Sequence, residues 1–578
     1  MESSQAEASA VQAAGSNLRR HAHLSGRQTP AQSADWYVRL FPSLTDLAFL
    51  FPLYFLFAKI GGVRYLLRDA DTGLQIRAGE WMLQNHGVPR VDIFSFSKAG
   101  QPWFAWEWGW DVLSALLHQR FGLAGFALAN CCILALTAVV IFRLARRRSG
   151  HPLLAFTITA LAVQASCVHW LARPHLLSWL LFSVLLLVLD RIQAGSRHWL
   201  WALPPLSLLW ANLHASFFLV ALLSLAYAAG DLLSGLFLGV GTLRSGYLRR
   251  AGRYAVAAVA SLSVSLLNPY GVELHQHVAK YLLDSRQLDV IREFQAFDFR
   301  HMPAVQIEIL LLTGSAAACW SFYRRRWADT FILLLWLHLA LHSTRNIPLF
   351  AFAVAGPASL MIRELLSLGC RSRTARGLMA GARAVLFFGR EFSSLEQVER
   401  FCLPSVAAVA MIALLLGARA PDAFDARFDN RVFPVGALTA QGPASARHLL
   451  TADQWGSYLI YAGYPNAKVF LDDRSDFYGA EFDSQAVRLF SAQYDWEKTL
   501  TRYQIDAALI SPSDPLATVM KLSAAWCVSY DDGIAVFFSR RLSAGQGAPG
   551  CPLLKPSVGL EIGRRHAQRS IGVSKVNR

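Results

Sequence analysis

Two aspartates separated by one residue, Asp69 and Asp71, follow the first strongly apolar stretch in the run RDADTGLQIRAGEW. A third acid, Glu107, lies further along in the aromatic run WEWGW. Carboxylates in this arrangement can take a proton as a general base, or they can hold Mg²⁺ or Mn²⁺ through their oxygens. Either aspartate could instead only cap the helix that follows, and Glu107 could only orient a helix in the membrane interface. Whether these acids do chemistry or only cap helices depends on where the surrounding elements place them.

The composition is that of a membrane protein with many spans. Of 578 residues, 54% are hydrophobic and only 16% are charged. The mean hydropathy of +0.33 is too apolar for an ordinary soluble domain. The net charge of +16 comes from short runs of Lys and Arg beside apolar stretches, which is typical of membrane topology and not of nucleic-acid binding. No two cysteines have CxxC spacing, so neither a zinc site nor a disulfide framework is indicated.

Apolar stretches of about 20 residues, oriented by the preference for basic loops inside, predict about eleven transmembrane helices. The amino end is then cytoplasmic and the carboxyl end lies outside, so the acids belong to a first outer loop at about 63–120. Two amphipathic segments of this loop suit helices lying in the membrane interface. The predicted spans are at about 43–62, 121–142, 152–171, 175–190, two within 199–239, 252–267, 305–322, 328–342, 347–362 and 401–418.

Three further parts flank this membrane domain of about 41–420. Residues at about 1–40 predict a disordered cytoplasmic tail, and about 541–578, rich in Gly, Pro and Arg, predict a second disordered tail. Between about 421 and 540, strand-like runs (HLLTA, KVFLDD, DAALISP, CVSYDDGIAVFFS) alternate with helical ones, which is the rhythm of a small extracytoplasmic α/β domain. Within it, LDDRSD ends a predicted strand, where ligand-binding loops often lie, but a solvated turn explains the run equally well.

Polar and ionisable residues concentrate at the predicted outer turns. Ionisable groups near hydrocarbon depth are costly unless they pair or line a cavity, so a cluster on one face indicates a functional site. Ordinary polarity of helix ends is the alternative for any single member. The cluster contains Asp69, Asp71, Arg77, Glu107, His169, Arg173, His175, Asn212, His214, Asn268, Glu273, His275, Arg345 and Asn346.

A family resemblance lies in the run DADTGLQIRAGEWMLQNHGVPRVDIFSF, followed by WEWGWDVL, ARPH, WANLH, LNPYG and RNIPLF. Together these resemble bacterial membrane proteins of the GT-C glycosyltransferase superfamily, over about residues 40–540. The resemblance implies a GT-C-like α-helical membrane protein of the bacterial inner membrane. It also implies a sugar taken from a polyprenyl-phosphate carrier on the outer face, with an acid of the first outer loop. The sugar, the acceptor and the carrier length do not follow from it.

The α/β part loosely resembles a second group. TADQWGSYLIYAGYPNAKVFLDDRSDFYG is similar to the segment that follows the Trp-Trp-Asp motif of oligosaccharyltransferase catalytic subunits. Here Gln454 precedes Trp455 and the full motif is absent. This departure argues against recognition of a peptide sequon.

The resemblance suggests a role for each candidate residue. In transfer from a lipid phosphosugar the phosphate leaves without a strong acid, whereas the incoming hydroxyl benefits from a base. We expect Asp71 to be that base, Asp69 its partner or a metal ligand, and Glu107 a second acid. No cofactor is certain, although Asp69 and Asp71 could hold Mg²⁺ or Mn²⁺. The expected partners are the lipid-linked donor and membrane lipids, and the expected substrate and phosphate ligands are Arg77, Arg173, His175, His214, Asn268 and Arg345.

Two other classes of function remain open at this stage. A secondary transporter would also carry buried charge, but it should show a repeated half and charges near the middle of the membrane, and neither is visible. An assembly protein that only displays its outer α/β domain needs no acids in the first outer loop. Alanine at Asp71 separates this last class from an enzyme.

Overall fold

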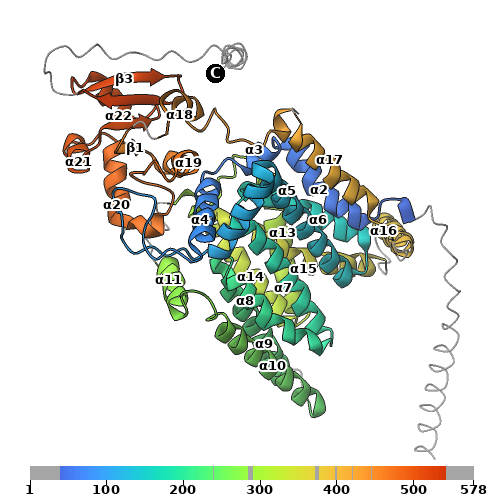
Figure 1. Ribbon diagram of the computed structural model, residues 1–578. Coiled ribbons are helices and arrows are strands. Elements are labelled where there is room, and N and C mark those ends of the chain that lie inside the picture. Colours follow the sequence, from blue (N-terminus) through green and yellow to red (C-terminus); the bar gives the residue numbers. More distant parts are fainter. Residues whose placement is uncertain are drawn as a thin grey trace, which may run out of the picture.

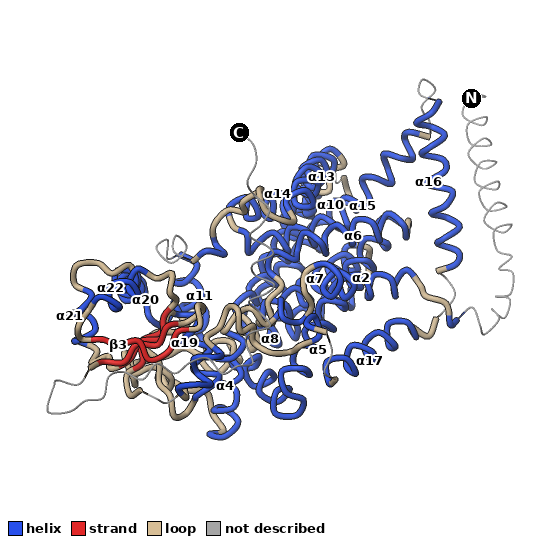
Figure 2. Tube along the Cα trace, turned by 90° about the horizontal axis from the view of Figure 1, so that it is seen from above, coloured by secondary structure: helices blue, strands red, loops and turns tan. Residues whose placement is uncertain are grey.

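The computed structural model describes residues 39–541, apart from 238–239, 284–290, 371–375, 397–399, 419–420 and 444–445. The predicted tails at 1–40 and 541–578 fall outside this part of the chain, except for 39–40 and 541. Figure 1 shows a helical bundle with a small α/β domain at one end, and Figure 2 shows the same arrangement from above.

Each predicted span corresponds to a helix of the bundle. Within the described residues, six helices are long and apolar enough to cross a membrane, and two more are apolar but shorter. The bundle confirms a polytopic helical fold, whereas the count of eleven spans stays a prediction. The helices that match the predicted spans are α2 (Leu44–Lys59), α5 (Trp108–Ser149), α6 (Pro152–Ser166), α7 (Pro174–Gln193), α8 (Leu203–Ala211), α9 (Leu219–Phe237), α10 (Thr242–Val264), α13 (Ala304–Tyr323), α14 (Trp327–His342), α15 (Ile347–Gly369) and α17 (Leu403–Gly417).

The segment predicted as the first outer loop, residues 63–120, keeps that name and contains the two helical segments that its amphipathic pattern predicts. One is α4 (Asp71–Asn85), which follows the short α3 (Val63–Leu66). The other is the first part of α5, which is separated from the remainder of that helix by a break at Gly122. Gly122 has a φ of 63°, a left-handed conformation that glycine adopts without steric cost. The chain therefore turns at Gly122 between an outer segment and a spanning segment.

Two other helices, α11 (Val272–Leu283) and α16 (Arg376–Leu395), match none of the predicted spans. Helix α11 lies between α10 and α13 in the chain, beside the α/β domain (Figure 1). Helix α16 lies at the end of the bundle away from that domain. The last turn of α5 carries three consecutive arginines, 146–148. This basic end is where positive-inside topology places the cytoplasm.

The α/β domain is built on one four-stranded sheet in the order β1-β2-β4-β3. The β1–β2 pair is parallel, and β4 runs antiparallel to both of its neighbours. Helices pack around this sheet, as the alternation of strand-like and helical runs predicts. The elements are α18 (Val435–Gln441), β1 (Leu449–Thr451), α19 (Asp453–Gly463), α20 (Ser475–Phe490), α21 (Trp496–Arg502), β2 (Ala507–Ile510), α22 (Pro515–Leu522), β3 (Trp526–Asp531) and β4 (Val536–Arg540).

One predicted strand of this domain is wrong. The run KVFLDD forms no strand, and its Val469 makes only isolated bridges to Ser95 and Leu449. The neighbour of this segment is a piece of the first outer loop: the Phe96 N–H donates to Val469 O at 3.0 Å, and the Val469 N–H donates to Phe94 O at 3.1 Å. This strand-like segment therefore lies between β1 of the domain's sheet and the first outer loop, bridging one residue of each.

The α/β domain shares a hydrophobic core with the first outer loop. Leu74 and Met82 of α4 belong to the same buried cluster as Phe433, Leu459 and Tyr530 of the α/β domain. Gly73 permits the close approach of α4 to α19, because a side chain there would collide with the ring of Tyr461. The domain is therefore joined to the loop that carries the acids.

Candidate active site

A cavity of about 1670 Å³ lies where one end of the helical bundle, the first outer loop and the α/β domain meet. On the side of the spanning helices its lining is largely apolar, with Trp179, Leu219, Leu222, Leu339 and Leu349. On the other side it is lined by carboxylates from separate stretches of the chain. The cavity therefore offers both an apolar wall and an acidic wall.

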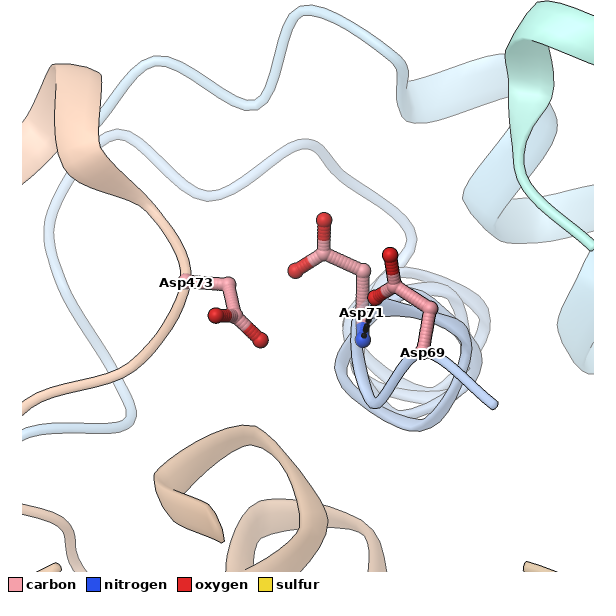
Figure 3. Close-up of side chains that lie close together, drawn as sticks. All are labelled: Asp69, Asp71 and Asp473. Carbon is pink, nitrogen blue, oxygen red and sulfur yellow. Dashed lines mark hydrogen bonds between the residues drawn. The ribbon is translucent and has the colours of Figure 1, made fainter. Parts of the chain in front are cut away.

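Three carboxylates on the acidic wall form a cluster. One oxygen from each of Asp69, Asp71 and Asp473 lies within 4.8 Å of the other two. Figure 3 shows Asp473 on a loop of the α/β domain, facing the two aspartates at the start of α4. Gln454 links the two sides: its Nε2 donates to Asp473 Oδ1 at 2.9 Å, and its Oε1 accepts from the Ala70 N–H at 3.2 Å. The cluster is thus assembled by two domains.

Helix capping explains one of the contacts of Asp69 and none of the contacts of Asp71. Asp69 Oδ1 accepts a hydrogen bond from the Asp71 N–H at 3.0 Å, which satisfies a free amide at the start of α4. Asp71 is the first residue of α4, and its side chain forms no cap. Capping therefore does not explain why an acid occupies position 71.

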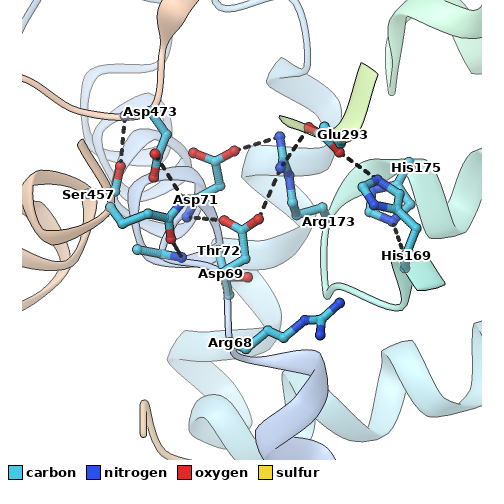
Figure 4. A network of polar contacts seen from close by, with 12 residues as sticks. Arg68, Asp69, Asp71, Thr72, His169, Arg173, His175, Glu293, Ser457 and Asp473 are labelled. Carbon is cyan, nitrogen blue, oxygen red and sulfur yellow. Dashed lines mark hydrogen bonds and ion pairs between the residues drawn. The ribbon is translucent and has the colours of Figure 1, made fainter. Parts of the chain in front are cut away.

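Arg173 is the cation at the centre of the site (Figure 4). Its Nη1 lies 3.1 Å from Asp69 Oδ2, and its Nη2 lies 2.6 Å from Asp71 Oδ2. A third acid, Glu293, approaches Arg173 Nη1 to 3.7 Å. The position of Arg173 follows from the preceding residue, because Ala172 O accepts from the Thr72 hydroxyl of α4 at 3.1 Å. One guanidinium thus faces three carboxylates.

Burial, together with the neighbouring charges, shifts the pKa of the carboxylates. Burial raises the pKa of Asp71 to about 8, because Arg173 only partly offsets burial and Asp69 adds repulsion. Burial and the nearby Asp71 likewise raise the pKa of Asp473 well above its usual range. Burial alone would raise the pKa of Glu293 too, but His169 and Arg345 bring that pKa well below its usual range. The site thus holds one firmly ionised acid beside a cluster that favours a proton or a cation.

The donor set of the cluster fits a hard divalent cation. All its ligand atoms are carboxylate oxygens, which Mg²⁺ and Mn²⁺ prefer. Asp473 Oδ2 is buried without a hydrogen-bond partner among the described residues. Asp69, Asp71 and Asp473 would hold the ion, so the sequence-based metal site at Asp69 and Asp71 gains a third candidate ligand.

Glu107 faces the cavity from the residue just before α5. Its Oε2 accepts from Gln75 Nε2 at 3.0 Å, and Gln75 Oε1 accepts from the Trp110 indole at 3.0 Å. His214 Nε2 lies 3.6 Å from the other oxygen of Glu107. The side chain of Glu107 makes no capping hydrogen bond at the start of α5. Its contacts are with Gln75 and His214 instead.

We expect the Glu107→Gln variant to be more stable than the wild type at alkaline pH. Burial raises the pKa of Glu107 from 4.5 to about 7. As pH rises from 4.5 to 7, the unfolded chain ionises this group while the folded protein retains its proton, so folding stability is lost. Glutamine keeps the hydrogen bond from Gln75 without this loss, so the gain at pH 8 should reach up to about 3 kcal/mol. Thermal unfolding in detergent at pH 5 and pH 8 measures it; a difference independent of pH would contradict the expectation.

Two predicted histidines line the cavity. His175 Nε2 lies 2.9 Å from His169 O, and the two imidazole rings are 4.3 Å apart. His214 Nδ1 lies 2.9 Å from the hydroxyl of Ser178 and 3.0 Å from that of Ser216. These contacts fix both rings in the wall of the cavity, where Arg345 also lies.

Arg77 and Asn268, predicted as substrate ligands, are not among the residues that line this cavity. Arg77 is six positions beyond Asp71 on α4 and so projects from another face of the helix. Its guanidinium donates to Tyr461 O at 2.7 Å and pairs with Glu80 at 2.5 Å. Asn268 shapes its own turn, donating to Ser265 O at 2.8 Å and accepting from the Tyr270 N–H at 2.8 Å.

Several residues of the site were not selected from the sequence. Glu293 lies in a polar loop with no motif around it, and it contacts His169 at 2.9 Å and Arg345 at 4.0 Å. Asp473 belongs to LDDRSD, which the sequence left undecided between a ligand loop and a solvated turn. The sequence marks Gln454 only as a departure from the Trp-Trp-Asp motif. For Asp473, the signal in the sequence is the acidic run LDDRSD at the end of a strand-like segment.

No protein-family model matches the chain, and no curated protein matches it. Two solved structures are similar to it in fold. One is the oligosaccharyltransferase of Archaeoglobus fulgidus in the apo form, with 12% identity and a TM-score of 0.49, covering 83% of this chain and 70% of that one. The other is the archaeal oligosaccharyltransferase AglB from the same organism, in complex with an inhibitory peptide and a dolichol-phosphate. It has 11% identity and a TM-score of 0.48, with 81% and 69% covered.

Proposed function

We propose that the protein is an integral membrane glycosyltransferase of the bacterial inner membrane. It transfers a sugar from a polyprenyl-phosphate-linked donor to a hydroxyl of an extracytoplasmic acceptor, which is a glycan, a lipid or a protein. The observation that carries this proposal is that one cavity joins an apolar wall, guanidinium groups and a carboxylate cluster. These are the three environments that a lipid, a phosphate and a reacting hydroxyl need.

The apolar wall and the arginines suit the donor. Leu219 and Leu222 of α9 with Leu339 of α14 lie on the bundle side of the cavity, where a polyprenyl chain can leave toward the bilayer. Arg345 contacts no carboxylate closer than 4.0 Å within the described residues. Arg68 pairs with no carboxylate there; its guanidinium lies over the Tyr65 ring at 3.9 Å. Both arginines line the cavity and can donate to phosphate oxygens.

The carboxylate cluster suits the acceptor hydroxyl. In the proposed reaction the bond between the sugar's anomeric carbon and the phosphate oxygen breaks, and the acceptor oxygen bonds to that carbon. The hydroxyl proton passes to a carboxylate, for which Asp71 is best placed. Both oxygens of Asp69 are engaged, one by the Asp71 N–H and one by Arg173, whereas Asp71 Oδ1 accepts no hydrogen bond from a described residue. A divalent ion bound at the cluster would supply charge neutralisation for the donor phosphate.

The orientation in the membrane supports an outward-facing site. The arginines at the end of α5 lie at the opposite end of that helix from Glu107 and the cavity. If this basic end is cytoplasmic, the amino terminus is inside and the α/β domain is outside. A lipid-linked donor would then be consumed on the extracytoplasmic side.

Sugar transfer by the purified protein in lipid tests the proposal directly. The substrates are a panel of radiolabelled polyprenyl-phosphate sugars with a mixed acceptor extract from the envelope. Transfer that requires Asp71 supports the proposal. If the donors bind the protein but none supports transfer, the result contradicts the proposal and favours a lipid-phosphate transporter or a display protein.

The Arg345→Gln variant should weaken donor binding more than it slows the chemical step. The charge-assisted hydrogen bond lost to a phosphate oxygen is worth about 1.5–3 kcal/mol, which corresponds to roughly a 10- to 150-fold rise in KM. Arg77→Gln is the matched control, because this arginine lies outside the cavity, and its KM should stay unchanged. Initial rates against donor concentration give both values. Equal KM values for the two variants would remove Arg345 from the phosphate site.

A further inference from the structure

Arg474 is a buried arginine between the α/β domain and the first outer loop. Its Nε and Nη2 lie 2.7 Å from the two oxygens of Asp472, and Nη2 also lies 2.7 Å from Asp92 Oδ1. Arg474 is only 7% exposed, and the side chains of Asp472 and Asp92 are not exposed at all. Two of these charge-assisted hydrogen bonds stay within the α/β domain, and the third, to Asp92, joins it to the first outer loop.

Aromatic rings from both domains surround the same guanidinium. Its central carbon lies 4.6 Å from the ring centre of Trp103 and 5.3 Å from that of Phe94, both in the first outer loop. From the α/β domain, Phe477 lies at 4.7 Å, and the Tyr478 hydroxyl donates to Asp472 Oδ2 at 2.9 Å. Cation–π contacts at a desolvated site add to the ion pairs. Groups of both domains thus surround Arg474, whose buried Nη1 alone has no hydrogen-bond partner among the described residues.

The neighbouring residue in the chain is Asp473 of the carboxylate cluster. Asp472 and Arg474 point into the interface with the first outer loop, and Asp473, between them, faces Asp69 and Asp71 (Figure 3). A displacement of Arg474 therefore moves Asp473. Gln454 and Ser457 of α19 also hold Asp473, through its side chain and its N–H, and Gln454 in turn accepts from the Ala70 N–H across the interface.

We propose that Arg474 is a positioning residue that fixes the α/β domain on the first outer loop and so carries Asp473 into the cluster with Asp69 and Asp71. The inference rests on the proposed function only in taking Asp473 as a site residue. Loss of the guanidinium leaves two buried carboxylates without their cation, and these are strongly unfavourable unless the interface opens to water. Lysine keeps the charge but cannot form the same fork with Asp472 and Asp92.

The test compares three variants of the full-length protein in lipid nanodiscs. Arg474→Lys removes the fork, and Asp92→Asn removes only the charge on the side of the first outer loop. Met520→Ala is the matched control, because Met520 is a fully buried core residue of α22 that takes no part in the contacts among Arg474, Asp472 and Asp92. Hydrogen–deuterium exchange follows segments 93–97 and 467–471, whose amides join the domains, and strands β2 and β4 as an internal reference. Mn²⁺ binding, measured by electron paramagnetic resonance, reports the cluster.

In both interface variants, amide exchange in the two joining segments should accelerate at least tenfold, while β2 and β4 keep the wild-type rate. Mn²⁺ affinity should fall at least tenfold in the same variants and stay unchanged in Met520→Ala. Unchanged exchange in the joining segments, or equal acceleration in β2 and β4, overturns the inference. Accelerated exchange with unchanged Mn²⁺ affinity overturns the link to Asp473. If the wild type binds no Mn²⁺, the metal site fails, and exchange alone still decides whether Arg474 joins the domains.

Discussion

Replacement of Asp71 by asparagine should lower the rate of sugar transfer by about 10²- to 10⁴-fold, the usual contribution of a general base. Asparagine has nearly the same shape, so the cavity and the packing of α4 should persist. It cannot take the proton of the acceptor hydroxyl. Arg173 would retain Asp69 at 3.1 Å and Glu293 at 3.7 Å as partners, so its position should change little. The measurement is the single-turnover rate with donor in excess.

The control variants separate the loss of a base from the loss of charge. Asp69→Asn removes one charge from the same cluster but leaves Asp71 free to accept a proton, so its effect on the rate should be smaller. Asp422→Asn, whose side chain is 88% exposed on the same side of the molecule, should have no effect. An Asp71→Asn protein that folds, binds donor and transfers sugar at the wild-type rate would return Asp71 to a structural role.

The pH profile of the reaction should reflect the same carboxylate. Without a bound metal ion, burial raises the pKa of Asp71 to about 8, so its ionised form, which is the base, becomes abundant only as pH approaches that value. The rate should therefore rise with pH through the neutral range and level off above it.

The membrane bundle was predictable from the sequence because lipid imposes strong rules. A span needs about 20 apolar residues, and basic loops mark the cytoplasmic side, so the order of helices follows from composition alone. The two amphipathic helices of the first outer loop were predictable for the same reason. The run KVFLDD was not predictable, because a strand-like pattern does not say which segments it will contact, and here it bridges both β1 and the first outer loop.

The candidate site was only half predictable, because it is assembled by contacts between distant stretches of the chain. Asp69, Asp71 and Arg173 could be found because they stand at the ends of predicted helices on one face of the membrane. Arg77 shares that side but projects from another face of α4, a distinction that needs the orientation of the helix. Glu293 carries no signal of its own, since only the loop's return to the outer ends of α14 and α15 brings it to His169.

Replacement of Asp473 by asparagine should reduce Mn²⁺ affinity at least tenfold and reduce metal-stimulated transfer in the same proportion. The residue supplies one of the three carboxylates of the cluster, and its Oδ2 has no hydrogen-bond partner among the described residues. A hard cation bound by three carboxylates loses a charged ligand in this variant, and the amide oxygen that remains is a weaker ligand. Titration of Mn²⁺ into the purified protein, followed by electron paramagnetic resonance, gives the affinity.

The matched control is Asp495→Asn, an exposed acid on the same domain, which should bind Mn²⁺ as the wild type does. Equal affinities for the Asp473 variant and this control would contradict a metal site formed across the two domains. A metal that binds the wild type and is lost with Asp473 would instead make the α/β domain a part of the catalytic centre. It would then no longer be a domain only displayed by the membrane bundle, because the sugar could not be transferred unless the two domains stayed together.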